Sequence, residues 1–147
     1  MSRRALLDVN VLVALFDVGH VHHEAAHDWF ADHHVAGWAT CPLTENGFLR
    51  YLTNPRTPVQ DDRTVVLASL RSLCSSTHHA FWPDAVSLRD ETLFDPRRIV
   101  SHRQLADVYL LGLAVSNGAC LATFDRSIPW KAVKGATAES LAVIAPA

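Results

Sequence analysis

The chain has 147 residues, which is about the length of one domain. Hydrophobic residues make up 49% and charged residues 19%, and this balance excludes a disordered chain. The formal net charge of −2 argues against a broadly basic nucleic-acid-binding coat, although it leaves room for a local basic rim.

The first part of the chain predicts strands that alternate with helices. A short apolar strand is expected over residues 5–8, and an apolar helix over 9–16 follows it. Apolar residues at helical spacing predict a second helix over 21–33. A second strand is expected over 38–41, and a proline then suits the first position of a helix over 42–52.

The second part of the chain continues the alternation. Ser101 and Gln104 form a capping-box pattern at the start of one of its helices. The helices are expected over residues 61–74, 87–94 and 101–117. The strands are expected over residues 79–82, 119–123 and 141–144. Apolar strands between helices predict an α/β fold with a short parallel sheet covered on both faces, in a single domain over residues 1–147.

Four carboxylates occupy notable places in this predicted fold. Asp8 follows the first strand, and Asp125 follows the fourth. Glu45 falls in the first turns of the helix that leaves the second strand, and Asp107 lies early in the helix that leads to the fourth. Because sites in parallel sheets collect outside the carboxyl ends of the strands, Asp8 and Asp125 are expected at such an edge.

Asp107 is the most informative of the four. Its neighbours at helical spacing are Leu110, Leu111 and Ala114, so it lies on an apolar face. A buried carboxylate needs a partner, and several carboxylates at one place are best stabilised by a divalent cation. Mg²⁺ takes hard oxygen ligands and binds phosphate oxygens, so such a site would suit water attack on a phosphodiester.

Each acid also has an ordinary structural interpretation. Asp8 could cap the helix that follows it, and Glu45 could interact with a helix dipole. Asp125 could be a turn residue, and Asp107 could pair with an arginine in a groove. The residues alone leave these alternatives open.

Segments along nearly the whole chain resemble one family. The opening LLDVNVLVAL looks like the start of a PIN-domain ribonuclease of the VapC toxin type. The stretch over residues 20–29 also resembles the loop and second helix of such toxins. Three later segments agree in order: PLTENGFLR at 42–50, HRQLADVYLL at 102–111 and LATFD at 121–125.

The resemblance implies an endoribonuclease dependent on Mg²⁺ or Mn²⁺, with a PIN-like three-layer α/β/α fold. The residues that match the family's catalytic and metal-binding acids are Asp8, Glu45, Asp107 and Asp125. Asp8 and Asp107 would be the surest metal ligands, and Glu45 would orient or deprotonate the attacking water. Asn10 and Thr123 match supporting polar positions, and the possible RNA contacts are Arg50, Arg103 and Arg126.

The resemblance also implies partners. It predicts a homodimer and a VapB-type antitoxin that blocks the site. The apolar residues expected to be available for the antitoxin, or else to be core, are Trp29, Phe30, Phe48 and Leu52. No apolar stretch reaches the ~18 residues of a membrane span. The scattered cysteines Cys41, Cys74 and Cys120 fit reduced thiols in a cytoplasmic protein.

Two other functions compete with the ribonuclease. His23-Glu24-Ala25-Ala26-His27 is an H-E-x-x-H sequence, which on a helix places two imidazoles on one face as in zinc metalloproteases. A surface role for these histidines is the simpler interpretation, because the chain has 9 histidines and no evident third ligand. The other alternative is a PIN-like module that binds RNA or protein without cleavage, against which the complete set of four acids counts.

Overall fold

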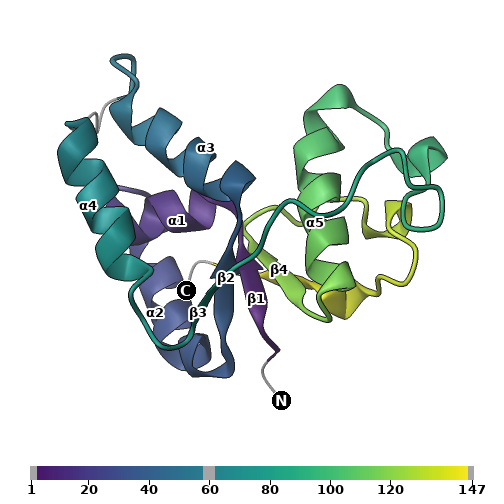
Figure 1. Ribbon diagram of the computed structural model, residues 1–147, viewed down its shortest axis with the longest axis horizontal. Coiled ribbons are helices and arrows are strands. Elements are labelled where there is room, and N and C mark those ends of the chain that lie inside the picture. The colour runs from purple at the N-terminus through teal and green to yellow at the C-terminus, as the bar shows by residue number, and fades with distance from the viewer. Residues whose placement is uncertain (1–2, 58–61, 146–147) are drawn as a thin grey trace.

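A computed structural model describes residues 3–57 and 62–145 of the chain. Within these residues, one five-stranded sheet has the order β3-β2-β1-β4-β5, and all of its neighbouring strands pair in parallel (Figure 1). Its strands are β1 (Ala5–Leu7), β2 (Trp38–Thr40), β3 (His79–Phe81), β4 (Cys120–Thr123) and β5 (Leu141–Val143). The predicted parallel α/β fold is therefore confirmed.

Helices cover both faces of this sheet, so the predicted three-layer arrangement is also confirmed (Figure 1). One face packs against α1 (Val9–Phe16), α2 (His23–His33), α3 (Pro42–Thr53) and α4 (Arg63–Leu73). The other face packs against α5 (Leu105–Ser116) and the irregular segments around it. Short 3₁₀ helices are formed by His34–Ala36, Pro96–Arg98, His102–Gln104, Trp130–Ala132 and Ala138–Ser140.

The apolar strands follow from these two layers. In β1, Ala5 and Leu7 join the core under α1 to α4, whereas Leu6 joins the core under α5. Successive side chains of a strand point to opposite faces, so a sheet covered on both faces needs apolar residues at every position. In the part of the chain that the structure describes, no helix is long and apolar enough to cross a membrane.

One predicted helix is absent. Residues 87–94 form turns instead, in which the Asp90 side chain accepts hydrogen bonds from the backbone N–H and hydroxyl of Thr92. Such local side-chain bonds compete with helical backbone bonds. Phe94 instead pairs with Val133 in an isolated antiparallel bridge.

Other boundaries differ by a few residues. The second helix begins at His23, and the capping box of Ser101 and Gln104 starts a 3₁₀ turn before α5 begins. The helix predicted from residue 61 is observed as α4, and residue 61 itself lies outside the described residues. Phe48 and Leu52 belong to the core, with 1% and 0% of their surfaces exposed, so they are not available to a partner.

The close packing of α5 rests on a glycine. A Cβ atom on Gly112 would lie 2.2 Å from the Phe94 ring, and that ring is itself buried. We expect Gly112→Ala to lower the free energy of unfolding by roughly 1–3 kcal/mol, because the ring has no room to retreat in a filled core. Urea denaturation measures this change.

Gly19→Ala is the matched control. A Cβ atom there meets only the Asp17 carboxylate, at an ordinary 3.4 Å, so the change in stability should stay within about 0.5 kcal/mol. Equal stabilities for the two variants would contradict this account of the α5 packing.

Candidate active site

Asp8 lies where β1 meets α1. Only 7% of its surface is exposed, and its side chain accepts a hydrogen bond from the backbone N–H of Val9 at the start of α1. Its other carboxylate oxygen accepts a hydrogen bond of 2.9 Å from the Thr123 hydroxyl at the end of β4. Asp8 is therefore fixed between two neighbouring strands at the sheet edge predicted for the site.

Asp125 is tied to the same threonine. Its backbone N–H donates to the Thr123 hydroxyl over 3.1 Å. Its exposed side chain accepts hydrogen bonds from the backbone N–H and hydroxyl of Ser127. The Thr123 hydroxyl thus binds both the side chain of Asp8 and the backbone N–H of Asp125. The pairing of β1 with β4 brings the two acids to one edge of the sheet.

Asp107 completes this group from the first turn of α5. Burial first, and then the negative charges of Asp8 and Asp125, together raise the pKa of its carboxyl to about 6. Burial also raises the pKa of Asp8, against the hydrogen bonds from Thr123 and Val9. The charges of Asp8 and Asp125 both act on Asp107, so the three carboxylates lie near one another.

Glu45 lies in a different set of contacts. It is half-buried in the first turn of α3, and its Oε2 accepts a hydrogen bond of 2.6 Å from the Thr40 hydroxyl. The same hydroxyl lies 2.8 Å from Nε2 of His79, and Cys74 is close by. Among the described residues, no hydrogen bond joins Glu45 to the three aspartates, and its contacts are with Thr40, next to His79 and Cys74.

The contacts of Glu45 were not predicted from the sequence. Thr40 ends β2, and His79 opens the neighbouring strand, where it pairs with Trp38. Residues two apart on a strand share a face, so this register places His79 on the same face as Thr40. The alternation of side chains along each strand contains the information needed to predict this contact. It can be used only once the pairing of β2 with β3 is known.

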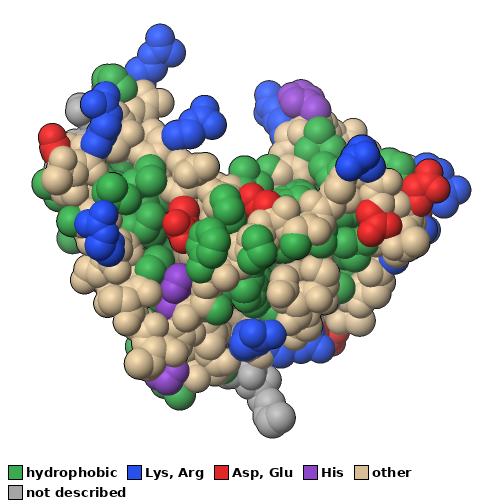
Figure 2. Space-filling model, in the orientation of Figure 1, with side chains coloured by type: hydrophobic (Ala, Val, Ile, Leu, Met, Phe, Trp, Pro, Cys, Tyr) green, Lys and Arg blue, Asp and Glu red, His purple; other side chains and the backbone are tan. Residues whose placement is uncertain are grey.

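The remaining predicted residues lie at the surface. Asn10 is exposed on the first turn of α1, and its side chain has no hydrogen-bond partner within the described ranges. The three arginines Arg50, Arg103 and Arg126 are exposed. Figure 2 shows acidic side chains inside a hollow between the two lobes and positively charged side chains on both rims.

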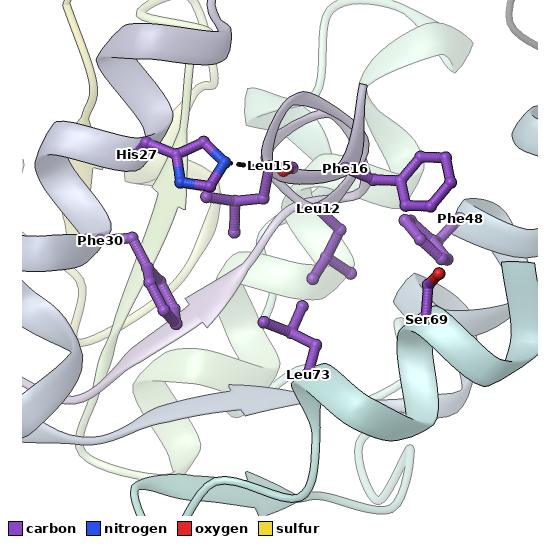
Figure 3. Close-up of a pocket in the computed structure, with 8 residues that line it drawn as sticks. All are labelled: Leu12, Leu15, Phe16, His27, Phe30, Phe48, Ser69 and Leu73. Carbon is purple, nitrogen blue, oxygen red and sulfur yellow. Dashed lines mark hydrogen bonds between the residues drawn. The ribbon is translucent and has the colours of Figure 1, made fainter. Parts of the chain in front are cut away.

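The H-E-x-x-H sequence has a structural role. His23 Nδ1 lies 2.7 Å from the carbonyl oxygen of Ala14, and His27 Nε2 lies 2.8 Å from that of Leu15. Figure 3 shows the imidazole of His27 directed at this carbonyl. Carbonyls in the last turn of a helix lack partners within the helix, so both imidazoles cap α1.

The three aspartates suit a divalent cation by their chemistry, although their carboxylate oxygens do not all lie within 4.8 Å of one another. No ion pair within the described ranges joins Asp8, Asp107 or Asp125 to a lysine or arginine, so no such side chain neutralises the group. Repulsion and burial both disfavour three negative charges there, and a cation with oxygen ligands would relieve both. The donor set, which is carboxylate oxygen alone, suits Mg²⁺ or Mn²⁺.

Comparisons with known proteins identify the family to which this fold belongs. Residues 5–134 match the PIN domain family. Ribonuclease VapC44 of Mycobacterium tuberculosis (strain ATCC 25618 / H37Rv) is 43% identical over 141 residues, which cover 96% of this chain and 99% of the relative. Ribonuclease VapC39 of the same strain is 41% identical over 89% of this chain and 95% of its own length. Ribonuclease VapC38 of that strain is 45% identical over 84% and 86%.

The chain therefore belongs to the PIN-domain family. Within that family it falls in the VapC ribonuclease group, given its identity to these relatives over nearly the whole chain. The predicted family is confirmed.

The charge of Asp107 should cost stability. Its pKa of about 6 in the folded protein exceeds the ordinary 3.8, so folding favours the protonated form. The destabilisation by Asp107 is therefore absent below about pH 4, and it grows as the pH rises toward and through 6. Without divalent ions, we expect Asp107→Asn to have a free energy of unfolding higher than that of wild type at pH 7.5, by on the order of 1–2 kcal/mol after allowance for solvent screening. It should therefore unfold at a higher temperature.

Thermal unfolding in a chelator between pH 4 and pH 8 measures this difference. It should vanish toward pH 4, where both side chains are neutral. Asp28→Asn on the exposed side of α2 is the control and should track wild type at every pH. A constant difference between Asp107→Asn and wild type across the range would refute the assigned charge repulsion.

Proposed function

We propose that the protein is a metal-dependent endoribonuclease that acts as the toxin of a type II toxin–antitoxin pair. The observation that carries this proposal is the meeting of Asp8, Asp107 and Asp125 at the carboxyl edge of the sheet, with the pKa of Asp107 raised to about 6. Membership of the VapC group supports the same reaction, hydrolysis of an RNA phosphodiester.

We assign the metal to Asp8 and Asp107, with Asp125 beside them. Thr123 occupies one oxygen of Asp8 and thereby fixes how its carboxylate faces the hollow. Asp107 approaches from α5 on the other side of the sheet. A bound Mg²⁺ or Mn²⁺ would polarise the phosphate and lower the pKa of a bound water.

Glu45 is assigned to the attacking water. The Thr40 hydroxyl holds Oε2 of Glu45, and within residues 3–57 and 62–145 no group donates to its Oε1. The free oxygen can therefore accept a proton from water, as a general base must. This role is compatible with the separation of Glu45 from the three-acid group.

The RNA backbone is assigned to the rims of the hollow. Arg50 on α3 and Arg126 beside Asp125 are both exposed, and Arg103 is exposed in the turn before α5. Guanidinium groups bind phosphates through forked hydrogen bonds. These cations would attract an anionic substrate to a site whose own side chains are acidic. Asn10 would support the acidic site.

A VapB-type antitoxin and a second copy of the chain are the proposed partners. An apolar cavity of about 180 Å³ opens between α1, α2 and α4, with Phe30, Leu12 and Leu73 on its walls (Figure 3). It has room for one apolar side chain of an antitoxin. Light scattering of the protein alone should give a dimer, and addition of a VapB-type antitoxin should give a larger complex, which should no longer cut RNA. A monomer that stays active beside this antitoxin would contradict both assignments.

A cytoplasmic location is also part of the proposal. Cys41, Cys74 and Cys120 are all free thiols, as expected where disulfides are kept reduced.

RNA cleavage tests the function. Purified protein should cut cellular RNA into discrete products in Mg²⁺ or Mn²⁺ but not in a chelator. Asp107→Asn should lower the rate by at least about 100-fold, because metal activation is worth several kcal/mol. Arg126→Ala is the comparison at the rim and should mainly raise KM.

Cleavage by Asp107→Asn at the wild-type rate would remove the assigned site. Cleavage that persists in a chelator would contradict the metal dependence. Binding of RNA without cleavage under any ion would favour a non-catalytic PIN module instead.

A further inference from the structure

We propose that Glu45, Cys74 and His79 form a second metal site, which takes Zn²⁺ in preference to Mg²⁺ and inhibits the enzyme when it is filled. The binding site stands on its own geometry, whereas the inhibition rests on the proposed function of Glu45. This group is separate from the three aspartates and from the H-E-x-x-H sequence.

The ligand atoms are already close together. One carboxylate oxygen of Glu45, Sγ of Cys74 and a ring nitrogen of His79 all lie within 4.8 Å of one another. No other group of three or more such residues in the described parts of the chain meets this distance. Ligand atoms around a tetrahedral Zn²⁺ are roughly 3.3–3.6 Å apart, given its usual bond lengths. Side-chain movements of roughly 1 Å, with release of one of the hydrogen bonds of the His79 ring, would therefore complete the site.

The hydroxyl of Thr40 contacts this group and orients its side chains. Thr40 is fully buried, and its hydroxyl contacts both Oε2 of Glu45 and Nε2 of His79, at 2.6 and 2.8 Å. The same hydroxyl also interacts with Cys74. Hydrogen bonds from neighbouring groups fix ligand orientation in protein metal sites, and loss of such a bond typically weakens metal binding.

The three ligands come from well-ordered elements. Glu45 lies in the first turn of α3, Cys74 caps the C-terminal end of α4, and His79 opens β3. The turn between α4 and β3 is closed by a backbone hydrogen bond from His79 to Ser76. All three side chains are half-buried, so solvent and ions can reach them.

The donor chemistry selects the ion. Sulfur, nitrogen and oxygen together suit Zn²⁺, whereas Mg²⁺ prefers oxygen alone and keeps several waters. Cys74 is a free thiol and would lose its proton to the solvent on binding. Three protein ligands leave a fourth position of the tetrahedron for water.

Filling this site would withdraw Glu45 from catalysis. A carboxylate bound to Zn²⁺ cannot also take a proton from the attacking water, so cleavage should fall even when Mg²⁺ is abundant. Zn²⁺ at this site would therefore inhibit without displacing the ion at the three aspartates.

Co²⁺ is the probe for the binding site, because a thiolate ligand gives it an intense near-ultraviolet absorption. We expect this band in wild type, its loss in Cys74→Ser, and Zn²⁺ affinity reduced at least about 10-fold in Cys74→Ser and Thr40→Val. Cys120→Ser and His78→Gln are matched controls from the same residue types and should bind Zn²⁺ as wild type does. Asp107→Asn should also keep the band, because it alters only the aspartate group.

Cleavage assays test the inhibition separately. Zn²⁺ added in the presence of excess Mg²⁺ should inhibit wild type but not Cys74→Ser, which should cut RNA normally without Zn²⁺. Absence of the Co²⁺ band, or equal Zn²⁺ affinity in Cys74→Ser, would overturn the site. Equal inhibition of both proteins would overturn the inhibitory role. A Co²⁺ band in a protein that never cuts RNA would support the site and contradict the proposed function.

Discussion

The hydrogen bond from Thr123 to the buried carboxylate of Asp8 is the contact on which the site depends. It joins the ends of β1 and β4, which pair although more than 100 residues separate them. From β1 the sheet extends through β2 to β3 on one side, and from β4 to β5 on the other. Ligands of parallel sheets bind where the strand order reverses in this way, and here that place is marked by an acid held in a fixed orientation. Asp107 then reaches the same place from α5, where burial and two like charges raise its pKa to about 6.

A second buried threonine repeats this arrangement on the other half of the sheet. Thr40 ends β2 as Thr123 ends β4, and each is almost inaccessible to solvent and donates its hydroxyl proton to a carboxylate. Around Thr123 the neighbouring groups are carboxylates only, which suits a hard cation. Around Thr40 they include a thiol and an imidazole, which suits a softer one. The same arrangement at two strand ends therefore orients two different sets of metal-binding groups.

The sequence predicted the layers because apolar strands and amphipathic helices reflect burial, which acts over a few residues. It failed at residues 87–94, where the Asp90 side chain favours a turn that periodicity does not reveal. It also predicted that Asp8 and Asp125 follow strand ends, as they do, but it did not predict the partners of Glu45. Those contacts depend on the register of β2 against β3, which is a long-range property. The H-E-x-x-H sequence misleads for a similar reason, since only packing of α2 on α1 shows that its imidazoles bond backbone carbonyls.

The most direct test of the central claim is to locate the metal itself. Crystals grown in Mn²⁺ and measured for anomalous scattering should show a peak in contact with Asp8 and Asp107, beside Asp125 and outside the contacts of Glu45 with Thr40. Asp8→Asn crystals should lose that peak, because the side chain held by Thr123 would offer one fewer negative charge to the ion. An Mn²⁺ peak elsewhere in the molecule, with none among the three aspartates, would contradict the account.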